Sequence, residues 1–155
     1  QDGQIMSNCS IYDNFLEPHL LDYCQKYFRN DTPFKFQRSD KSNENFFLMG
    51  TPPHDCLIDF IFFKIKIVSQ KNLEMTRFYT NLQFSNMVSD LHIDDGQTTC
   101  LLMIAGEGDF ELGEQVIPFK ENRLILFDSK IPHRGRSPKK GYRITLAYKT
   151  NEIPN

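Results

Sequence analysis

The sequence lacks paired cysteines and a strong excess of charge of either sign. Its cysteines, Cys9, Cys24, Cys56 and Cys100, are widely spaced and form no CxxC pair. This spacing argues against a zinc knuckle or a disulfide framework and favours buried or free thiols in a reducing compartment. The formal net charge of -2 argues neither for nor against a polyanionic partner.

The sequence also lacks a long apolar run, a repeat and a low-complexity segment. Its most apolar stretch, CLIDFIFFKIKIV, is interrupted by Asp59, Lys64 and Lys66 and is too short and too charged to span a bilayer. The first residues, QDGQIMSNCS, have neither the basic start nor the apolar run of a signal peptide, and Gln1 suggests a trimmed end. We therefore expect a soluble, cytoplasmic protein with no membrane partner.

What is present is enough apolar material for one domain over residues 1–155. The hydrophobic content is 39%, with 14 Phe and 6 Tyr to fill a core. The part from about residue 13 to residue 70 is predicted to be mainly helical. NFLEPHLLDYCQKYFRN has apolar residues at helical spacing, with Pro18 in the first turn. Residues 55–70 fit a helix or a strand, of which we favour the helix, and short strands and loops are expected over residues 30–55.

From residue 73 the pattern changes to short apolar or alternating runs separated by turns. We expect strands at LEMTRFYTNLQF, VSDLHI, TTCLLMIA, GDFEL, EQVIPF, RLILFD and GYRITLAYK. CLLMI and LILF are apolar on both faces, as in the central strands of two packed sheets. The predicted fold is mainly β with N-terminal helices, a double-stranded β-helix of the jelly-roll, cupin-like type, with its core over about residues 73–150.

Two ionisable residues, His92 and Asp94, stand two apart in LHIDDG where apolar residues are expected. Residues i and i+2 of a strand point to the same face. His133, after the apolar strand and Pro132 in FDSKIPHRG, adds a second imidazole. Two His and one carboxylate form the facial triad typical of non-haem Fe(II) oxygenases, which leaves half of the metal's coordination sphere open to a co-substrate and O₂.

A cation and a hydroxyl follow on one face of the last predicted strand. Arg143, Thr145 and Ala147 share that face, and guanidinium–carboxylate hydrogen bonds contribute about 1.5 to 3 kcal/mol each. Upstream, Tyr79, Asn81 and Gln83 form a polar face in FYTNLQF, because they alternate with Phe78, Thr80, Leu82 and Phe84. This pattern predicts a pocket for a small carboxylate.

The chain resembles the Fe(II)- and 2-oxoglutarate-dependent dioxygenases over about residues 74–150, and is most similar to short prolyl-4-hydroxylase-like members, some of them phage-encoded. The shared pattern is His-x-Asp, a distant His, and an Arg ten residues later with Thr two beyond it. The resemblance implies the metal ligands His92, Asp94 and His133, and a 2-oxoglutarate anchor at Arg143. It also implies 2-oxoglutarate contacts from Thr145, Asn81 and Tyr79. The implied cofactors are Fe(II), 2-oxoglutarate and O₂, and the implied reaction is hydroxylation coupled to formation of succinate.

Other interpretations remain open at this point. Taken singly, His92, His133 and Arg143 each fit a surface residue, with Arg143 paired to Glu111. The clamp residue is Arg where animal and algal prolyl hydroxylases usually have Lys, and their Gly-Gly-Glu-Thr stretch is missing. A peptide of prolyl type is the favoured substrate. Nucleic acid bound by the basic loop 134–140 is a less favoured alternative, as is a free small molecule. A non-redox cupin-like metal-binding protein is the second alternative, and the oligomeric state is not predicted.

Overall fold

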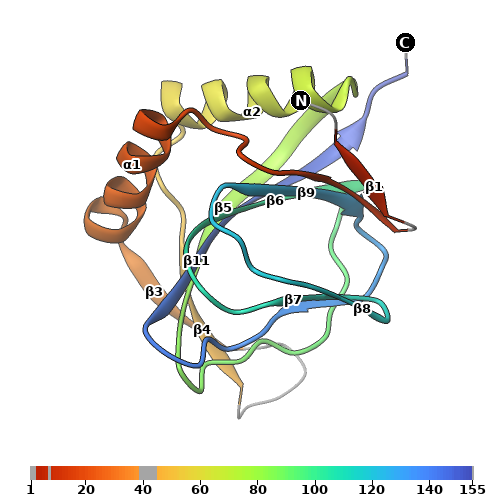
Figure 1. Ribbon diagram of the computed structural model, residues 1–155. Helices are drawn as coiled ribbons and strands as arrows, with labels where there is room; N and C mark the ends of the chain where they lie inside the picture. Colours follow the sequence, from red (N-terminus) through yellow and green to blue (C-terminus); the bar gives the residue numbers. More distant parts are fainter. Residues whose placement is uncertain (1–2, 7, 39–44, 155) are drawn as a thin grey trace.

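The computed structural model describes residues 3–6, 8–38 and 45–154, and every structural statement below refers to these residues. Two antiparallel sheets lie face to face, and two helices cover the outer face of the larger one (Figure 1). In order across the large sheet, its strands are β1 (Gln4–Met6), β2 (Cys9–Tyr12), β9 (Arg123–Asp128), β6 (Thr98–Gly106), β11 (Tyr142–Glu152), β5 (Leu73–Phe84), β4 (Phe46–Gly50) and β3 (Phe34–Arg38). The small sheet contains β10 (His133–Gly135), β7 (Phe110–Leu112) and β8 (Gln115–Ile117).

The centre of the large sheet is formed by the strands that the sequence marks as apolar on both faces. Every residue of β6 except Gly106 is buried, and so are four of the six residues of β9. A strand buried on both faces needs a second layer on each side. The predicted mainly-β, jelly-roll class is confirmed.

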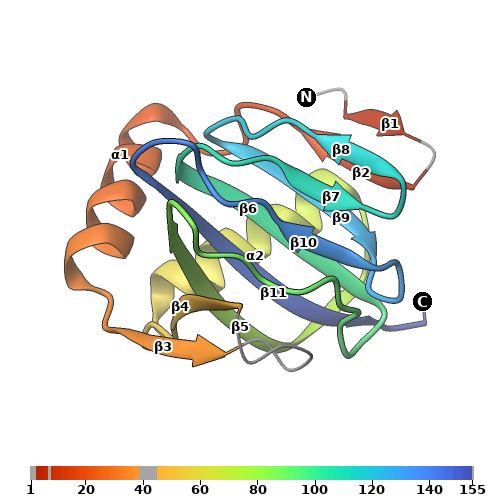
Figure 2. The same ribbon diagram turned by 90° about the horizontal axis from the view of Figure 1, so that it is seen from below.

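Two apolar clusters lie on the two faces of the large sheet. One lies between the large sheet and the helices and includes Phe28, Ile61, Leu102 and Tyr148. The other lies between the two sheets and includes Met103, Phe110 and Ile125 (Figure 2 shows the small sheet over β6 and β11). Alternation along β11 places Ile144 and Leu146 on the helix side and Ala147 on the small-sheet side. The face predicted to carry Arg143 and Thr145 is therefore the face between the sheets.

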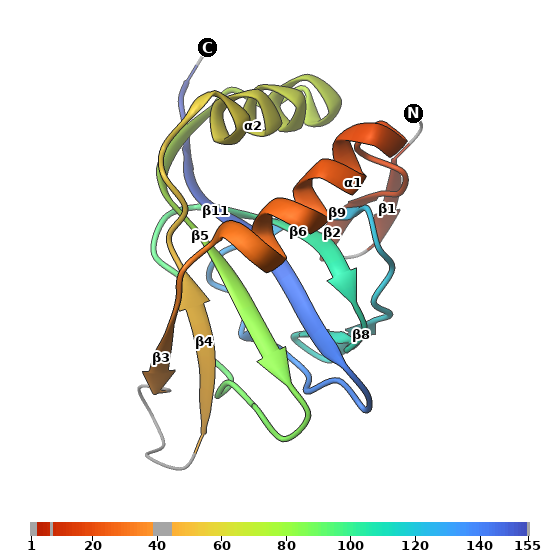
Figure 3. The ribbon, with the colours of Figure 1, turned by 90° about the vertical axis from the view of Figure 1, so that its left-hand side faces the viewer.

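The helix predictions are confirmed. α1 spans Pro18–Lys26 and continues as a π-helical turn, Tyr27–Asp31, and α2 spans Cys56–Ser69. The ambiguous segment is a helix because Asp55 caps its first turn and Ile58, Ile61 and Ile65 are buried at helical spacing. Figure 3 shows both helices on the side of the large sheet that faces away from the small one. No helix in the described part of the chain is long and apolar enough to cross a membrane.

The strand predicted at VSDLHI is wrong. The segment before β6 makes an isolated bridge between His92 and His133 and no longer ladder. The main-chain N–H of His92 donates to the carbonyl of His133, and that of Asp94 donates to the carbonyl of Ser129. A step of two residues along one segment is therefore matched by a step of four residues along the other. The ladder cannot continue across this mismatch, which contains Pro132, a residue without an N–H. The segment is extended without being a strand.

The N-terminal strands β1 and β2 were not predicted. β2 adds to the edge of the large sheet beside β9, with Ile11 opposite Ile125. β3 and β4 fall in the region where short strands were expected. The part from 13 to 70 is thus less helical than its apolar periodicity suggested.

Candidate metal centre and its pocket

Three predicted residues from two distant segments meet at the inner face of the small sheet. The Nε2 atom of His133 lies 2.9 Å from Oδ2 of Asp94, and that of His92 lies 3.6 Å from Oδ1 of Asp94. All three donor atoms lie within 4.8 Å of one another. Two ligands at about 2.1 Å from an ion and at right angles lie about 3 Å apart, so the three atoms fit one side of a divalent ion.

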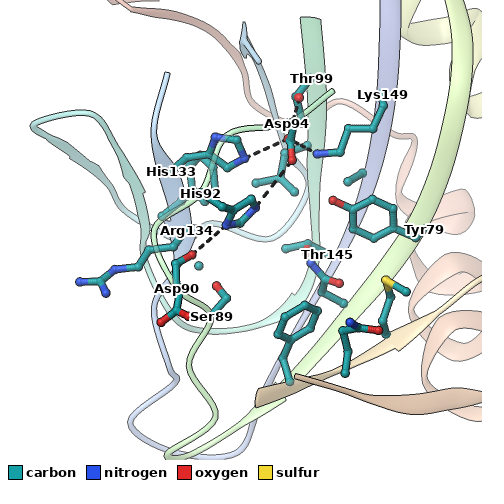
Figure 4. A pocket seen from close by; sticks show the side chains of 18 of the residues that line it. Tyr79, Ser89, Asp90, His92, Asp94, Thr99, His133, Arg134, Thr145 and Lys149 are labelled. Atoms are coloured by element: carbon teal, nitrogen blue, oxygen red, sulfur yellow. Dashed lines mark hydrogen bonds and ion pairs between the residues drawn. The ribbon is translucent and has the colours of Figure 1, made fainter. Parts of the chain in front are cut away.

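The bridge between His92 and His133 fixes both rings. Nδ1 of His92 lies 2.8 Å from the carbonyl of Asp90, and Nδ1 of His133 lies 2.7 Å from the carbonyl of Ile131. A carbonyl oxygen only accepts, so each Nδ1 must carry the proton and donate it. In the neutral imidazole each Nε2 then has a free lone pair directed at Asp94, the arrangement found in metal-binding histidines (Figure 4).

Neutral imidazole lone pairs facing a carboxylate repel one another unless a positive charge lies between them. Burial lowers the pKa of His92, so its imidazole favours the neutral form. Asp94 is held as an anion: burial acts to raise its pKa, but its contact with His133 and the charge of Lys149 outweigh burial and lower it. The donor set of two neutral nitrogens and one carboxylate therefore fits a divalent cation.

Further side chains hold the Asp94 carboxylate in place. The hydroxyl of Thr99 lies 2.9 Å from its Oδ2 and 3.0 Å from the hydroxyl of Ser129, and Lys149 also contacts Oδ2. Lys149 is 3% exposed, and the sequence analysis missed it. Lys149 lies two residues after Ala147 on β11, so it shares the face of Arg143, Thr145 and Ala147. This spacing is the feature of the sequence from which it could have been predicted.

Arg143 is a buried guanidinium with no carboxylate partner in the part of the chain that the structure describes. It is 2% exposed, and its Nε donates to the carbonyl of Gly108 and its Nη1 to Oε1 of Gln83. Burial lowers its pKa to about 10, so the group stays charged at neutral pH, and Asp109 acts in the opposite direction without forming an ion pair. The reading of Arg143 as a surface partner of Glu111 is wrong, because Glu111 pairs with Arg134 and Arg136.

Two glycines leave room for this guanidinium. A Cβ at Gly135 would lie 2.6 Å from Nη1 of Arg143, and a Cβ at Gly108 would lie 2.9 Å from its Cδ. Gly108 also has a φ of +117°, which non-glycine residues rarely adopt. The chain around Arg143 is therefore shaped to admit the group into the interior.

The triad and Arg143 line one cavity of about 590 Å³ between the sheets. Three buried polar atoms in it have no hydrogen-bond partner among the described residues: Nη2 of Arg143, Oγ1 of Thr145 and Oδ1 of Asn81. Asn81 and Thr145 are direct cross-strand neighbours. Buried polar atoms are rarely left unpaired, so the arrangement indicates a polar, anionic ligand.

The remaining candidates divide between the cavity and the surface. Tyr79 lines the cavity and lies opposite Ala147, nearer the triad than Arg143 in the register. Asp90 also lines it, and its Oδ1 accepts from Asn45. Glu111 engages two of the cations in the basic loop 134–140, which favours a charged surface loop over a nucleic-acid groove.

The four cysteines are free. Cys9, Cys24 and Cys100 are buried and Cys56 is exposed. Burial raises the pKa of Cys24 and of Cys100 to about 12. Thiols with such high pKa values are poor metal ligands and poor nucleophiles, and none of the four lines the cavity.

No protein-family model matches the chain, and a search of curated proteins gives no match. Solved structures do match. One is a 2OG-Fe(II) oxygenase family oxidoreductase from Burkholderia pseudomallei, with a TM-score of 0.73 and 10% identity over 92% of this chain and 84% of that one. Another is HygX from Streptomyces hygroscopicus with nickel and 2-oxoglutarate bound, with a TM-score of 0.68 and 10% identity over 91% and 81% of the two chains.

A third is a prolyl hydroxylase from Trichoplax adhaerens in complex with a peptide of a hypoxia-inducible factor. Its TM-score is 0.67 and its identity 17%, over 93% of this chain and 84% of that one. At such low identity these matches establish the fold. This chain shares the fold of 2-oxoglutarate–Fe(II) oxygenases, prolyl hydroxylases among them.

Proposed function

We propose that this protein is an Fe(II)- and 2-oxoglutarate-dependent dioxygenase that hydroxylates a C–H bond. The observation that carries the proposal is the meeting of a His-Asp-His cluster and an uncompensated buried guanidinium in one cavity. Neither feature alone distinguishes a 2-oxoglutarate enzyme from another metal-binding jelly roll. In a cupin-like protein without this co-substrate, Nη2 of the buried Arg143 would need another anionic partner.

In this proposal His92, Asp94 and His133 hold the iron. Three protein ligands leave open positions, as a co-substrate and O₂ require, whereas a structural zinc site would take a fourth protein ligand. When bound, Fe(II) and 2-oxoglutarate supply the oxidative chemistry, in which O₂ is consumed and 2-oxoglutarate becomes succinate and CO₂.

The protein's own residues bind and orient the co-substrate. Nη2 of Arg143 donates to the distal carboxylate, and Thr145 and Asn81 satisfy their unpaired oxygens on the ligand or on water beside it. The nearby apolar residues Leu101, Phe110 and Phe127 limit the entry of water. Tyr79 lines the end nearer the triad, where the keto acid would approach the metal.

We further propose a substrate of peptide type, with prolyl residues as the first class to test. This rests on the shared fold with the Trichoplax adhaerens prolyl hydroxylase, whose structure contains a peptide. The pairing of Arg134 and Arg136 with Glu111 lowers the net positive charge of this loop and makes a polyanionic nucleic acid the weaker candidate. A panel of prolyl peptides, oligonucleotides and free amino acids, scored for stimulation of succinate release, separates these classes.

The test of the reaction is succinate formation from 2-oxoglutarate with ferrous iron under air. The wild type should show slow turnover without substrate, and His133→Ala should abolish it. Arg143→Gln should raise the KM for 2-oxoglutarate more than tenfold, because one charge-assisted contact is lost. Lys139→Gln, on the exposed loop, is the control. Equal rates from the wild type and His133→Ala would reject the mechanism.

A further inference from the structure

One face of α2 is apolar and faces outward from the molecule. Phe60, Phe63 and Ile67 are 48%, 58% and 60% exposed, and Cys56, the first residue of the helix, is exposed as well. Figures 1 and 3 show α2 as an outer element, and no other element in the described part of the chain lies over this face. Several large apolar side chains on one exposed face mark an interaction surface.

The spacing of these residues is that of a helix that packs on another helix. Cys56, Phe60, Phe63 and Ile67, here called the exposed stripe, follow one another at intervals of four, three and four residues. Residues at such intervals form the seam along which two paired helices contact each other. The exposed stripe therefore fits a second helix that lies along α2.

The charges beside the exposed stripe indicate the direction of that second helix. Asp59 lies in the first turn of α2 and Lys66 in the last, and both are on the same side of the stripe because seven residues are close to two full turns. An antiparallel second copy brings its Lys66 next to Asp59, and by symmetry its Asp59 next to Lys66. A parallel copy would instead set the acidic first turns side by side and the basic last turns side by side.

The apolar residues match the same antiparallel register. When the two-fold axis passes between Phe60 and Phe63, Phe60 lies opposite Phe63 of the second copy. Cys56 then lies opposite Ile67 of the second copy. The stripe is thus complementary to itself, as the interface of a symmetric dimer must be.

The size of the stripe predicts a reversible dimer. Its three large side chains expose about 300 Å² of apolar surface per chain. An interface built on it lies at the lower end of specific interfaces, so we expect a dissociation constant in the micromolar range. A membrane surface fits less well, because interfacial helices carry mainly basic residues beside their apolar face, whereas α2 has Asp59 there.

We propose that this protein forms a symmetric dimer in which the α2 helices of two copies pack antiparallel through the exposed stripe. The helices cover one face of the large sheet, and the cavity with the His-Asp-His cluster lies on its other face. Pairing through α2 therefore leaves the cavity free. The inference goes beyond the proposed function and does not depend on it.

Sedimentation equilibrium of the full chain over a wide range of protein concentration is the first test. The wild type should pass from monomer to dimer, and Phe63→Ser should raise the dissociation constant at least tenfold, because it removes a central aromatic contact. Val116→Ser is the control, since Val116 is 43% exposed on the small sheet and should leave the dimer unchanged. Mn²⁺ affinity, measured by calorimetry, should be equal in all three proteins.

A chain that stays monomeric at every concentration would reject the dimer, whatever its Mn²⁺ affinity. If that monomer binds anionic lipid vesicles and Phe63→Ser does not, the stripe is a membrane contact and the dimer is again rejected. Loss of Mn²⁺ binding in a chain that still forms the dimer would reject the metal site and leave the dimer standing.

Charge reversal tests the direction of the helices. Asp59→Lys and Lys66→Asp should each weaken the dimer at least fivefold, because each places like charges together at two symmetric points. The double variant should restore most of the affinity, since the same pairs form with their signs exchanged. An association that depended on apolar contact alone would show no such rescue, and absence of rescue would reject the antiparallel pairing.

Ile67→Cys tests the register, since the new thiol would lie opposite Cys56 of the second copy. The Cys56 residues of the two copies themselves lie about 16 Å apart along the helix axis, too far for a disulfide. At concentrations where both proteins are dimers, mild oxidation should link Ile67→Cys covalently and leave the wild type unlinked. Addition of Cys56→Ser should abolish the link. A covalent wild-type dimer, or an Ile67→Cys dimer that does not link, would contradict the proposed arrangement.

Discussion

At the scale of single residues, the main-chain carbonyls behind the two histidines decide the chemistry. Asp90 and Ile131 accept from Nδ1 of the rings and so present Nε2 to the cavity. The orientation of each ring is thus set by a backbone hydrogen bond. Such preorganisation reduces the entropy lost when an ion binds.

The hydroxyl of Thr99 should support the metal through Asp94. Thr99→Val keeps the shape of the side chain but removes its hydrogen bond to Oδ2. Loss of such an outer contact typically weakens metal binding about 10- to 100-fold, and we expect a value in this range from Mn²⁺ titration calorimetry. Thr98→Val is the matched control, since its hydroxyl contacts Glu152 instead. Equal affinities in the two variants would show that Thr99 does not hold the ligand.

Gly135 should be required for the 2-oxoglutarate end of the cavity. In Gly135→Ala the new methyl group would press on Nη1 of Arg143 and on Oε1 of Gln83, 2.9 Å from the added carbon. We expect at least a tenfold loss of 2-oxoglutarate affinity with Mn²⁺ affinity retained, both measured by calorimetry. Gly141→Ala is the control: it is also strained, with φ +64°, but the added carbon meets nothing within 4 Å. An unchanged 2-oxoglutarate affinity in Gly135→Ala would argue against a crowded pocket around Arg143.

The sequence predicted His92, Asp94, His133 and Arg143, and the structure brings the first three together and buries the fourth in the same cavity. Ionisable residues are unusual next to such apolar runs, and this contrast in the sequence is what pointed to them. Thr99 and Lys149 were not assigned roles, because each is ordinary in a strand sequence. Their importance depends on cross-strand distances that the sequence alone does not contain.

At the scale of elements, α2 shows how a capping residue resolves an ambiguous segment. Its apolar residues fit a helical stripe, but KIKIV also alternates as a strand does. Asp55 accepts from the N–H groups of Leu57 and Ile58, which settles the start of a helix. The apolar content alone left the type of element open.

Removal of this cap should destabilise the protein without affecting the cavity. Asp55→Ala should lower the free energy of unfolding by about 1 kcal/mol, and Asp55→Asn should retain most of it, since both Asp and Asn cap well. Urea denaturation monitored by circular dichroism measures the change. Unequal Mn²⁺ affinities of the wild type and Asp55→Ala would show that α2 is coupled to the metal site.

Two elements escaped prediction for reasons of context. VSDLHI has strand composition, but its partner segment contains two extra residues and Pro132, so the ladder stops at the His92–His133 bridge. β2 is a four-residue strand whose partner, β9, lies more than 100 residues away. Local propensity cannot reveal a pairing of such long range.

At the scale of the whole molecule, polar contacts hold the N-terminal segment before α1 against the start of β9 and the turn that precedes it. Asn122 exchanges two hydrogen bonds with the main chain of Leu16, and Asp13 forms ion pairs with Arg123 and Lys120. The hydrogen bond from Arg123 is the largest cause of the lowered pKa of Asp13, which is about 2. These contacts position α1 over the sheet that carries the cavity.

Asp13 should make folding stability fall in acid. Its pKa is lower in the folded state than the ordinary value of about 3.9, so its contribution is complete above pH 4 and is lost as the pH falls toward 2. After allowance for partial exposure we expect about 1 to 2 kcal/mol. Asp13→Asn should be less stable at pH 7 and should lose less stability than the wild type between pH 4 and pH 2. Parallel pH profiles in urea titrations would contradict this.

The central claim is that three side chains from distant points of the chain hold one divalent ion on one side and leave its other side open to 2-oxoglutarate. The most direct measurement is the visible absorption of the Co²⁺-loaded protein under anaerobic conditions, with and without 2-oxoglutarate. We expect one Co²⁺ per chain, weak bands typical of five or six ligands, and a spectral change on adding 2-oxoglutarate that Arg143→Gln shifts to higher concentration. Intense bands typical of a closed four-ligand site, or a spectrum that 2-oxoglutarate leaves unchanged, would contradict the account.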